Sequence, residues 1–153
     1  ECQTLQTGGD INKNFFEKAI DFVRGYADKF HHAKEEDILF LEFNKCAAEG
    51  GTHCNPVEQM LHEHTLGRDF IKKLEEGIVE DDKNKIIENA QGYAHLLQDH
   101  IYKEHNILYP MADEALKQEV KDAMLAKFKE VEQQRLSERD KYLLFVTEIE
   151  ASA

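Results

Sequence analysis

The strongest constraint on how this chain folds is a long stripe of apolar side chains near its beginning. Residues spaced three and four apart share one face of an α-helix. Glycine pairs at 8–9 and 50–51 bracket the run, and no stretch of any length alternates apolar and polar residues as a half-buried strand does. The pattern predicts one long helix whose inner face also carries ionisable groups. The residues on this stripe are Phe16, Ile20, Val23, Ala27, His31, Glu35 and Ile38.

Two further helices have clear start signals. Asn55 can cap a second helix, with Pro56 at its first position and Glu58 reaching back to complete a capping box. We expect this helix to end near Gly77, and the acidic run at 80–82 to cap a third helix.

The end of the third helix and the two ends of the chain are also predicted. Pro110 should stop or kink the third helix, because proline lacks an amide donor and crowds the preceding turn. Two more helical segments follow, at about residues 113–135 and 138–150, and residues 1–14 read as a connecting loop. The fold class is therefore all-α, an antiparallel up-down helical bundle.

Composition narrows the classes of partner. The chain has 153 residues, enough for one domain with a real core, and carries 31 acidic against 19 basic residues, a net charge of −12. This balance argues against nucleic acid and against an anionic membrane surface, since both require a basic face. No apolar run of about 18 residues is present to span a membrane. Three cysteines without a dense framework are typical of reduced thiols, and we expect a cytoplasmic protein.

The ionisable part of the first stripe is repeated in the third helix. Aligning residues 31–40 with residues 100–109 gives the shared pattern His-x-x-Lys-Glu-x-x-Ile-Leu-aromatic. The alignment superposes His31 on His100 and Glu35 on Glu104. A histidine and a glutamate four residues apart lie on the same helix face, and the apolar residues that follow turn that face toward the core.

Two such helices facing each other would bring two imidazoles and two carboxylates together inside the bundle. That donor set suits iron, manganese or zinc, and carboxylates can bridge a pair of metal ions. Both the alignment and the phase of the stripe favour His31 and Glu35 as the inward pair. We therefore expect the neighbouring His32 and Glu36 on a solvated flank of the helix.

The second helix offers two histidines. His64 shares the apolar stripe of Leu61, Gly67 and Ile71, so we select it as a ligand, whereas His62 lies on a wetter side and is expected in an outer or surface position.

Three other side chains keep open roles. His105 could hydrogen-bond a ligand, bind metal or face water. Tyr93 and Tyr102 could approach the site or simply pack with their hydroxyls at its rim.

His31-x-x-x-Glu35, Glu63-His64 and His100-x-x-x-Glu104 on three successive helices resemble the hemerythrin-like (HHE cation-binding) family over nearly the whole chain. The pair Glu63-His64 followed by Gly67 is similar to the form in that superfamily's iron-centre repair branch. The resemblance implies two non-haem irons joined by an oxo or hydroxo group, with zinc or manganese as alternatives. It implies Glu35 and Glu104 as bridges, with His31, His64 and His100 as terminal ligands.

The chain departs from the family pattern at its beginning. Members usually begin with another long helix that supplies a further histidine, and residues 1–14 contain none. We expect that helix to be absent from this chain, leaving an open side that the two extra C-terminal helices, or a second copy in a homo-oligomer, would cover. The expected organisation is a single domain over residues 1–153, with 1–14 as a loop remnant, 15–110 as the ligand-bearing helices and 111–153 as the C-terminal helices.

Three functions fit these observations. The favoured one is a hemerythrin-like iron protein that binds or senses O2, NO or iron itself. The second is a diiron enzyme that decomposes peroxide or delivers iron for cluster repair. The third and weakest is a metal-free helical interaction module.

Overall fold

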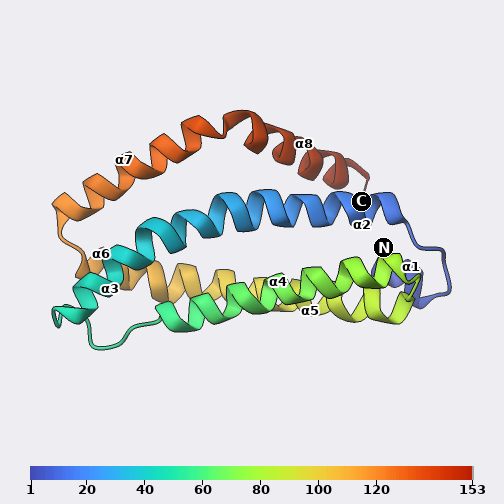
Figure 1. Ribbon diagram of the computed structural model, residues 1–153, viewed down its shortest axis with the longest axis horizontal. Helices are drawn as coiled ribbons and strands as arrows, with labels where there is room; N and C mark the ends of the chain where they lie inside the picture. The colour runs from blue at the N-terminus through green and yellow to red at the C-terminus, as the bar shows by residue number, and fades with distance from the viewer. Residues whose placement is uncertain (153) are drawn as a thin grey trace.

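The computed structural model describes residues 1–152. They form helices joined by short loops, with no strand among them, as the sequence predicts. Successive long helices alternate in direction (Figure 1). After a short helix α1 (Cys2–Gln6), the first long helix comprises α2 (Lys13–Phe22), η1 (Val23–His32), η2 (Glu35–Leu39) and α3 (Phe40–Ala48). Next come α4 (Val57–Val79), then α5 (Lys83–Lys103) with η3 (Glu104–Leu108) and α6 (Tyr109–Ala115), and finally α7 (Gln118–Gln134) and α8 (Leu136–Ser152).

The helix boundaries follow from local chemistry. The Asp82 side chain accepts a hydrogen bond of 3.0 Å from the Lys85 amide and caps α5 as predicted. The Asn55 side chain accepts one of 3.0 Å from the Val57 amide, where α4 begins. Gly50, with φ at +79°, adopts the left-handed conformation that follows many helices and separates α3 from the loop beyond it.

One boundary prediction was wrong, and of the two outcomes expected at Pro110, a stop or a kink, the stop does not occur. Residues 1–14 are not all loop, because they contain α1, whose Leu5 is buried against the bundle. Pro110 does not stop the third helix, which continues to Ala115. The wider π-helical turn of η3 ends two residues before Pro110, so the proline ring avoids the carbonyl that a regular α-turn would place against it.

Within residues 1–152, three segments have π-helical winding, in which each amide bonds to the carbonyl five residues back. The long one is η1, and the two short ones, η2 and η3, begin at Glu35 and Glu104. These are equivalent positions of the sequence repeat, so the repeat is a structural one as well. Single turns of this kind concentrate at functional sites in proteins.

The interior consists of two apolar clusters. The first contains Ile38, Leu39, Phe40, Phe43, Val57, Met60, Leu108, Ala112, Leu116 and Met124. The second, toward the opposite end of the bundle, contains Leu5, Phe16, Ile20, Ile71, Leu74, Ile78 and Ile86. On each of the three long helices the buried histidines and glutamates fall between the residues of these two clusters, so a polar layer crosses the middle of the bundle.

The C-terminal helices α7 and α8 run along the first long helix (Figure 1). Val120, Phe128 and Val131 of α7 pack against the first apolar cluster. Tyr142 of α8 makes an edge-on ring contact with Phe22 at 6.0 Å between centroids, and Lys141 pairs with Asp21 at 2.7 Å. None of the helices in residues 1–152 has the length and apolar character needed to cross a membrane.

Truncating the first apolar cluster tests this packing. Phe43 is 0% exposed, so we expect Phe43→Ala to lower the free energy of unfolding by about 3–5 kcal/mol through lost burial and a residual cavity. Leu41→Ala, two residues away and 52% exposed, should change it by less than about 1 kcal/mol. Urea denaturation of the two variants measures both values. Equal losses would show that the cluster does not hold this end of the bundle together.

Candidate metal centre

The polar layer consists of histidines and glutamates that three helices bury at one level. Six of them are almost inaccessible, and burying such groups is costly unless each is paired or binds a cation. They are His32, Glu35, Glu63, His64, His100 and Glu104.

The five residues that the sequence singles out come together in this layer. The Glu35 carboxylate oxygen Oε2 lies 3.4 Å from His64 Nε2 and 3.9 Å from His31 Nε2. The Glu104 oxygen Oε1 lies 3.1 Å from His100 Nε2 and 3.5 Å from His31 Nε2. The two carboxylates thus stand between His31 on one side and His64 with His100 on the other.

His31 is the most accessible member of the set. Its side chain is 40% exposed and borders a pocket of about 340 Å³. Glu35 and Tyr109 also line this pocket, and α7 contributes the apolar side chains of Leu125 and Phe128. Helix α7 therefore packs over this side of the bundle and leaves a pocket beside His31.

The expectation that His32 and Glu36 face solvent was wrong. His32 is 7% exposed, and its ring stacks on that of His64 with centroids 3.8 Å apart. The cause is the ten-residue π-helical segment η1, which turns less per residue than an α-helix, so the extrapolated phase fails at its end. Glu36 is half-buried and approaches His64 Nδ1 to 2.7 Å.

Two histidines are oriented by carboxylates on their Nδ1 side. His64 Nδ1 donates to Glu36, and His100 Nδ1 donates to Glu63 at 2.9 Å. Arg68 holds Glu36 at 2.8 Å, and Lys103 and Gln59 both donate to Glu63. A carboxylate on the far nitrogen fixes the tautomer and direction of a metal-binding imidazole.

This orientation makes the layer suitable for a cation. With Nδ1 of both rings directed at carboxylates, the Nε2 atoms of His64 and His100 lie 3.1 Å apart inside the layer. His100 Nε2 also lies 3.1 Å from Glu104 Oε1, and a metal ion that displaced the proton between them would have both Nε2 atoms within reach. Nitrogen ligands of a tetrahedral ion at 2.0–2.1 Å bond length lie about 3.4 Å apart. Glu35 Oε2 is also buried with no hydrogen-bond partner in the described structure. The residues present therefore fit a metal ion.

The electrostatics of the layer point the same way. Burial would raise the pKa of Glu104, but hydrogen bonds from His100 and His31 outweigh it and hold that pKa far below its usual range. The hydrogen bond to Glu104 raises the pKa of His31. Burial lowers the pKa of His100, yet its bonds to Glu104 and Glu63 leave it raised. The carboxylates hold protons on these rings, and a metal ion entering the layer would displace them.

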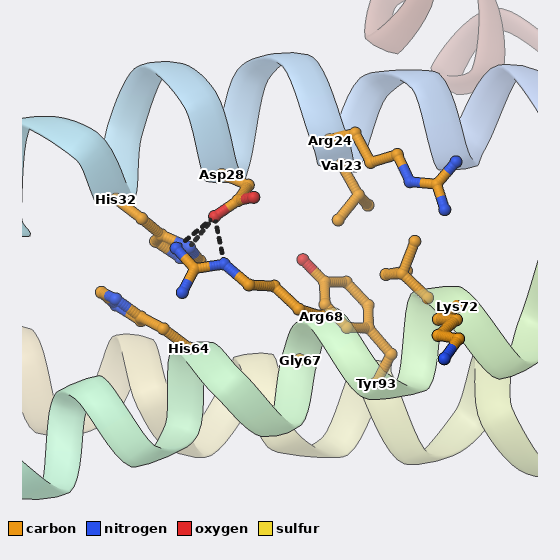
Figure 2. A pocket seen from close by; sticks show the side chains of 10 residues that line it. Val23, Arg24, Asp28, His32, His64, Gly67, Arg68, Lys72 and Tyr93 are labelled. Atoms are coloured by element: carbon orange, nitrogen blue, oxygen red, sulfur yellow. Dashed lines mark hydrogen bonds and ion pairs between the residues drawn. The ribbon is translucent and has the colours of Figure 1, made fainter.

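Two tyrosines border the layer. The Tyr109 hydroxyl donates to Glu35 Oε1 at 2.8 Å, and burial raises its pKa, which keeps it protonated as a donor. Tyr93 does approach the site. It lines a second pocket, of about 250 Å³, beside His32 and His64 (Figure 2), and its buried hydroxyl has no hydrogen-bond partner there. Tyr102 is 65% exposed and stays away.

His62 and His105 face solvent in the structure, so neither joins the layer.

Sequence reasoning missed the residues that support the layer from outside. Asp28 and Arg68 had been given no role, and Lys103 had been noted only as the lysine of the repeated pattern. The one available signal was Asp28 standing four residues before His32, on the same helix face.

A helical bundle with histidines and carboxylates converging on its interior defines a metal-binding bundle protein. The model of the hemerythrin HHE cation-binding domain matches residues 2–112. The chain belongs to this family, which confirms the resemblance drawn from its motifs. Comparisons with curated proteins and with solved structures found no match.

The metal-free protein should lose stability as pH falls below the ordinary histidine range. Burial, together with His64, His31 and His100, lowers the pKa of His32 from 6.5 to about 3, while Asp28 acts in the opposite sense. Unfolding below pH 6.5 thus requires proton uptake, which favours the unfolded state by up to about 1.4 kcal/mol per pH unit. His31 and His100 have raised pKa values, so their contribution to the free energy of unfolding is lost only above pH 6.5. Glu104 has a lowered pKa, so its contribution is lost only below about pH 4.5.

Between pH 4.5 and 6.5 the slope therefore reports His32. Denaturant melts of chelator-treated protein should show stability rising with pH in this window, with the slope reduced in His32→Gln. His62→Gln, which changes an exposed histidine, should retain the slope of the unsubstituted protein. A slope unaffected by His32→Gln would contradict a neutral, buried His32.

Proposed function

We propose that this protein binds iron through His31, Glu35, His64, His100 and Glu104. The observation that supports this most directly is the position of the two carboxylates between the histidines. Glu35 lies within 3.9 Å of both His31 and His64, and Glu104 lies within 3.5 Å of both His31 and His100. Carboxylates so placed can bridge two ions, and the proposed centre would hold two irons with Glu35 and Glu104 as the bridging ligands.

The donor set favours a borderline first-row metal. Imidazole nitrogen together with carboxylate oxygen suits iron, manganese and zinc, and no thiol approaches the layer among the described residues. Family membership favours a cation site, for which iron is the usual occupant, and zinc and manganese are the competing occupants.

The pocket beside His31 suggests that the centre takes a small ligand. Its volume of about 340 Å³ far exceeds that of a diatomic molecule, and the Leu125 and Phe128 side chains make part of its wall apolar. Iron held by histidine and carboxylate supplies reversible binding of diatomic molecules such as O2 or NO. At the edge of the pocket the Tyr109 hydroxyl donates a hydrogen bond to Glu35, and Leu125 and Phe128 of α7 form its apolar wall. We infer a protein that binds or senses a diatomic ligand.

Anaerobic Fe(II) loading tests the metal site. Chelator-stripped protein should take up about two irons per chain and melt at a higher temperature, because an ion that binds only the folded state stabilises it. Glu35→Ala and Glu104→Ala should each lower iron content and the thermal shift, measured by elemental analysis and calorimetry.

Glu88→Ala, an exposed change on α5, is the matched control and should load like the unsubstituted protein. Protein that stays metal-free after loading would eliminate the proposal and favour a metal-free interaction module. Peroxide turnover well above that of free iron, lost in both glutamate variants, would instead assign the centre to an enzyme.

The carboxylate that orients His100 should matter although it is not a proposed ligand. Glu63→Gln keeps the shape but weakens the acceptor on His100 Nδ1, and we expect a 10–100-fold loss in metal affinity. Competition with a chromophoric chelator measures the dissociation constant. Glu58→Gln, an exposed change on the same helix, should leave that constant unchanged. Similar constants for both variants would show that Glu63 does not act through His100.

A further inference from the structure

His32 is a buried imidazole that is not among the five proposed metal ligands. Its Nδ1 atom is inaccessible and has no hydrogen-bond partner within the described structure. A histidine that serves only the core is normally hydrogen-bonded, since burying an unpaired polar group is costly. The ring stacks on His64 and lies edge-on to His100, with centroids 5.7 Å apart. It therefore faces two proposed ligands rather than the apolar clusters.

The surroundings of His32 repeat those of His64 and His100. Asp28 Oδ1 stands 3.6 Å from His32 Nδ1, one helical turn away on η1. Arg68 donates from Nε to that same Asp28 oxygen at 2.9 Å, as Figure 2 shows, and from Nη2 to Glu36 at 2.8 Å. Each of the three histidines thus has a carboxylate on its Nδ1 side, and each carboxylate is held by a cation.

We propose that His32 is a metal ligand, completing a three-histidine position with His64 and His100 next to the His31, Glu35 and Glu104 position. This proposal rests on the proposed metal-binding function and adds a sixth ligand to it. One ring nitrogen from each of the three histidines lies within 4.8 Å of the others. A bound ion would draw these nitrogens toward the separation of about 3.4 Å that tetrahedral ligands adopt.

The two metal positions then differ in chemistry. One is made of three neutral imidazoles, and the other has one imidazole and two carboxylates that it shares with its neighbour. Arg68 becomes a positioning residue for the nitrogen-rich position, because a single guanidinium steadies the carboxylates behind both His32 and His64.

Zn(II) loading of the full chain, labelled with ¹⁵N in its histidine rings, tests the proposal directly. Zinc coordination should shift one ring-nitrogen resonance of His32 together with the Nε2 resonances of His64 and His100. The Nε2 resonance of the exposed His62 should not move. This readout uses the unsubstituted protein, so it does not depend on any variant folding.

Affinity provides the second arm. His32→Gln should weaken Co(II) binding, followed by its visible absorption, by at least about tenfold, and His62→Gln should not. Asp28→Asn should give a smaller loss, since it removes an orienting charge and leaves the ring in place.

The outcomes separate this proposal from the one it rests on. If the unsubstituted protein binds no metal, the proposed function fails. The unsubstituted protein could instead bind metal, with binding lost in Glu35→Ala. If the His32 resonances then do not shift and His32→Gln binds metal with unchanged affinity, only the assignment of His32 as a ligand is overturned.

Discussion

The rest of this structure depends on a layer of histidines and glutamates buried across the middle of a helical bundle. Apolar clusters on either side of the layer supply the hydrophobic stabilisation. Burying the layer itself costs free energy, because desolvated imidazoles and carboxylates are stable only when paired. Each feature around it answers that requirement. Glu36 and Glu63 accept from the outer nitrogens of His64 and His100, Arg68 and Lys103 neutralise those carboxylates, and the inner nitrogens are left facing one another.

Sequence patterns predicted the fold well where local chemistry decides it. The absence of strand alternation, the three-and-four spacing, the glycines at 50–51 and the cap at Asp82 were enough for an all-α bundle with helices in nearly the observed places. They failed where a π-helical turn changes the local rules. Pro110 is tolerated because η3 precedes it, and the residues of η3 carry no pattern that predicts π-helical winding.

The same physics explains which site residues were found. Residues 31–40 and 100–109 share one sequence pattern, so aligning them identifies equivalent positions whatever the local helical winding. The alignment singled out His31, Glu35, His100 and Glu104, and all four lie in the layer. His32 has no counterpart in that alignment, and its expected place on the solvated flank relied on a phase extrapolated through ten residues whose winding is not α-helical. Phase is a dependable guide over a few α-helical turns, but the smaller turn per residue of π-helical winding accumulates over the ten residues of η1 and brings a different face inward at its end.

Charge balance gives a reason why the layer is built for cations. Asp28, Glu35, Glu36, Glu63 and Glu104 contribute five carboxylates, against the permanent charges of Arg68 and Lys103 only. Protons on His31 and His100, whose pKa values are raised, make up part of the difference when no metal is present. One divalent ion would bring the net charge of the layer close to zero, and a second would make that charge slightly positive. The pairs of groups that hold those protons, His31 with Glu104 and His100 with Glu104, are also pairs of proposed ligands. Proton and metal therefore compete for the same atoms, and the raised pKa values in the metal-free protein express the same negative potential that would attract the metal.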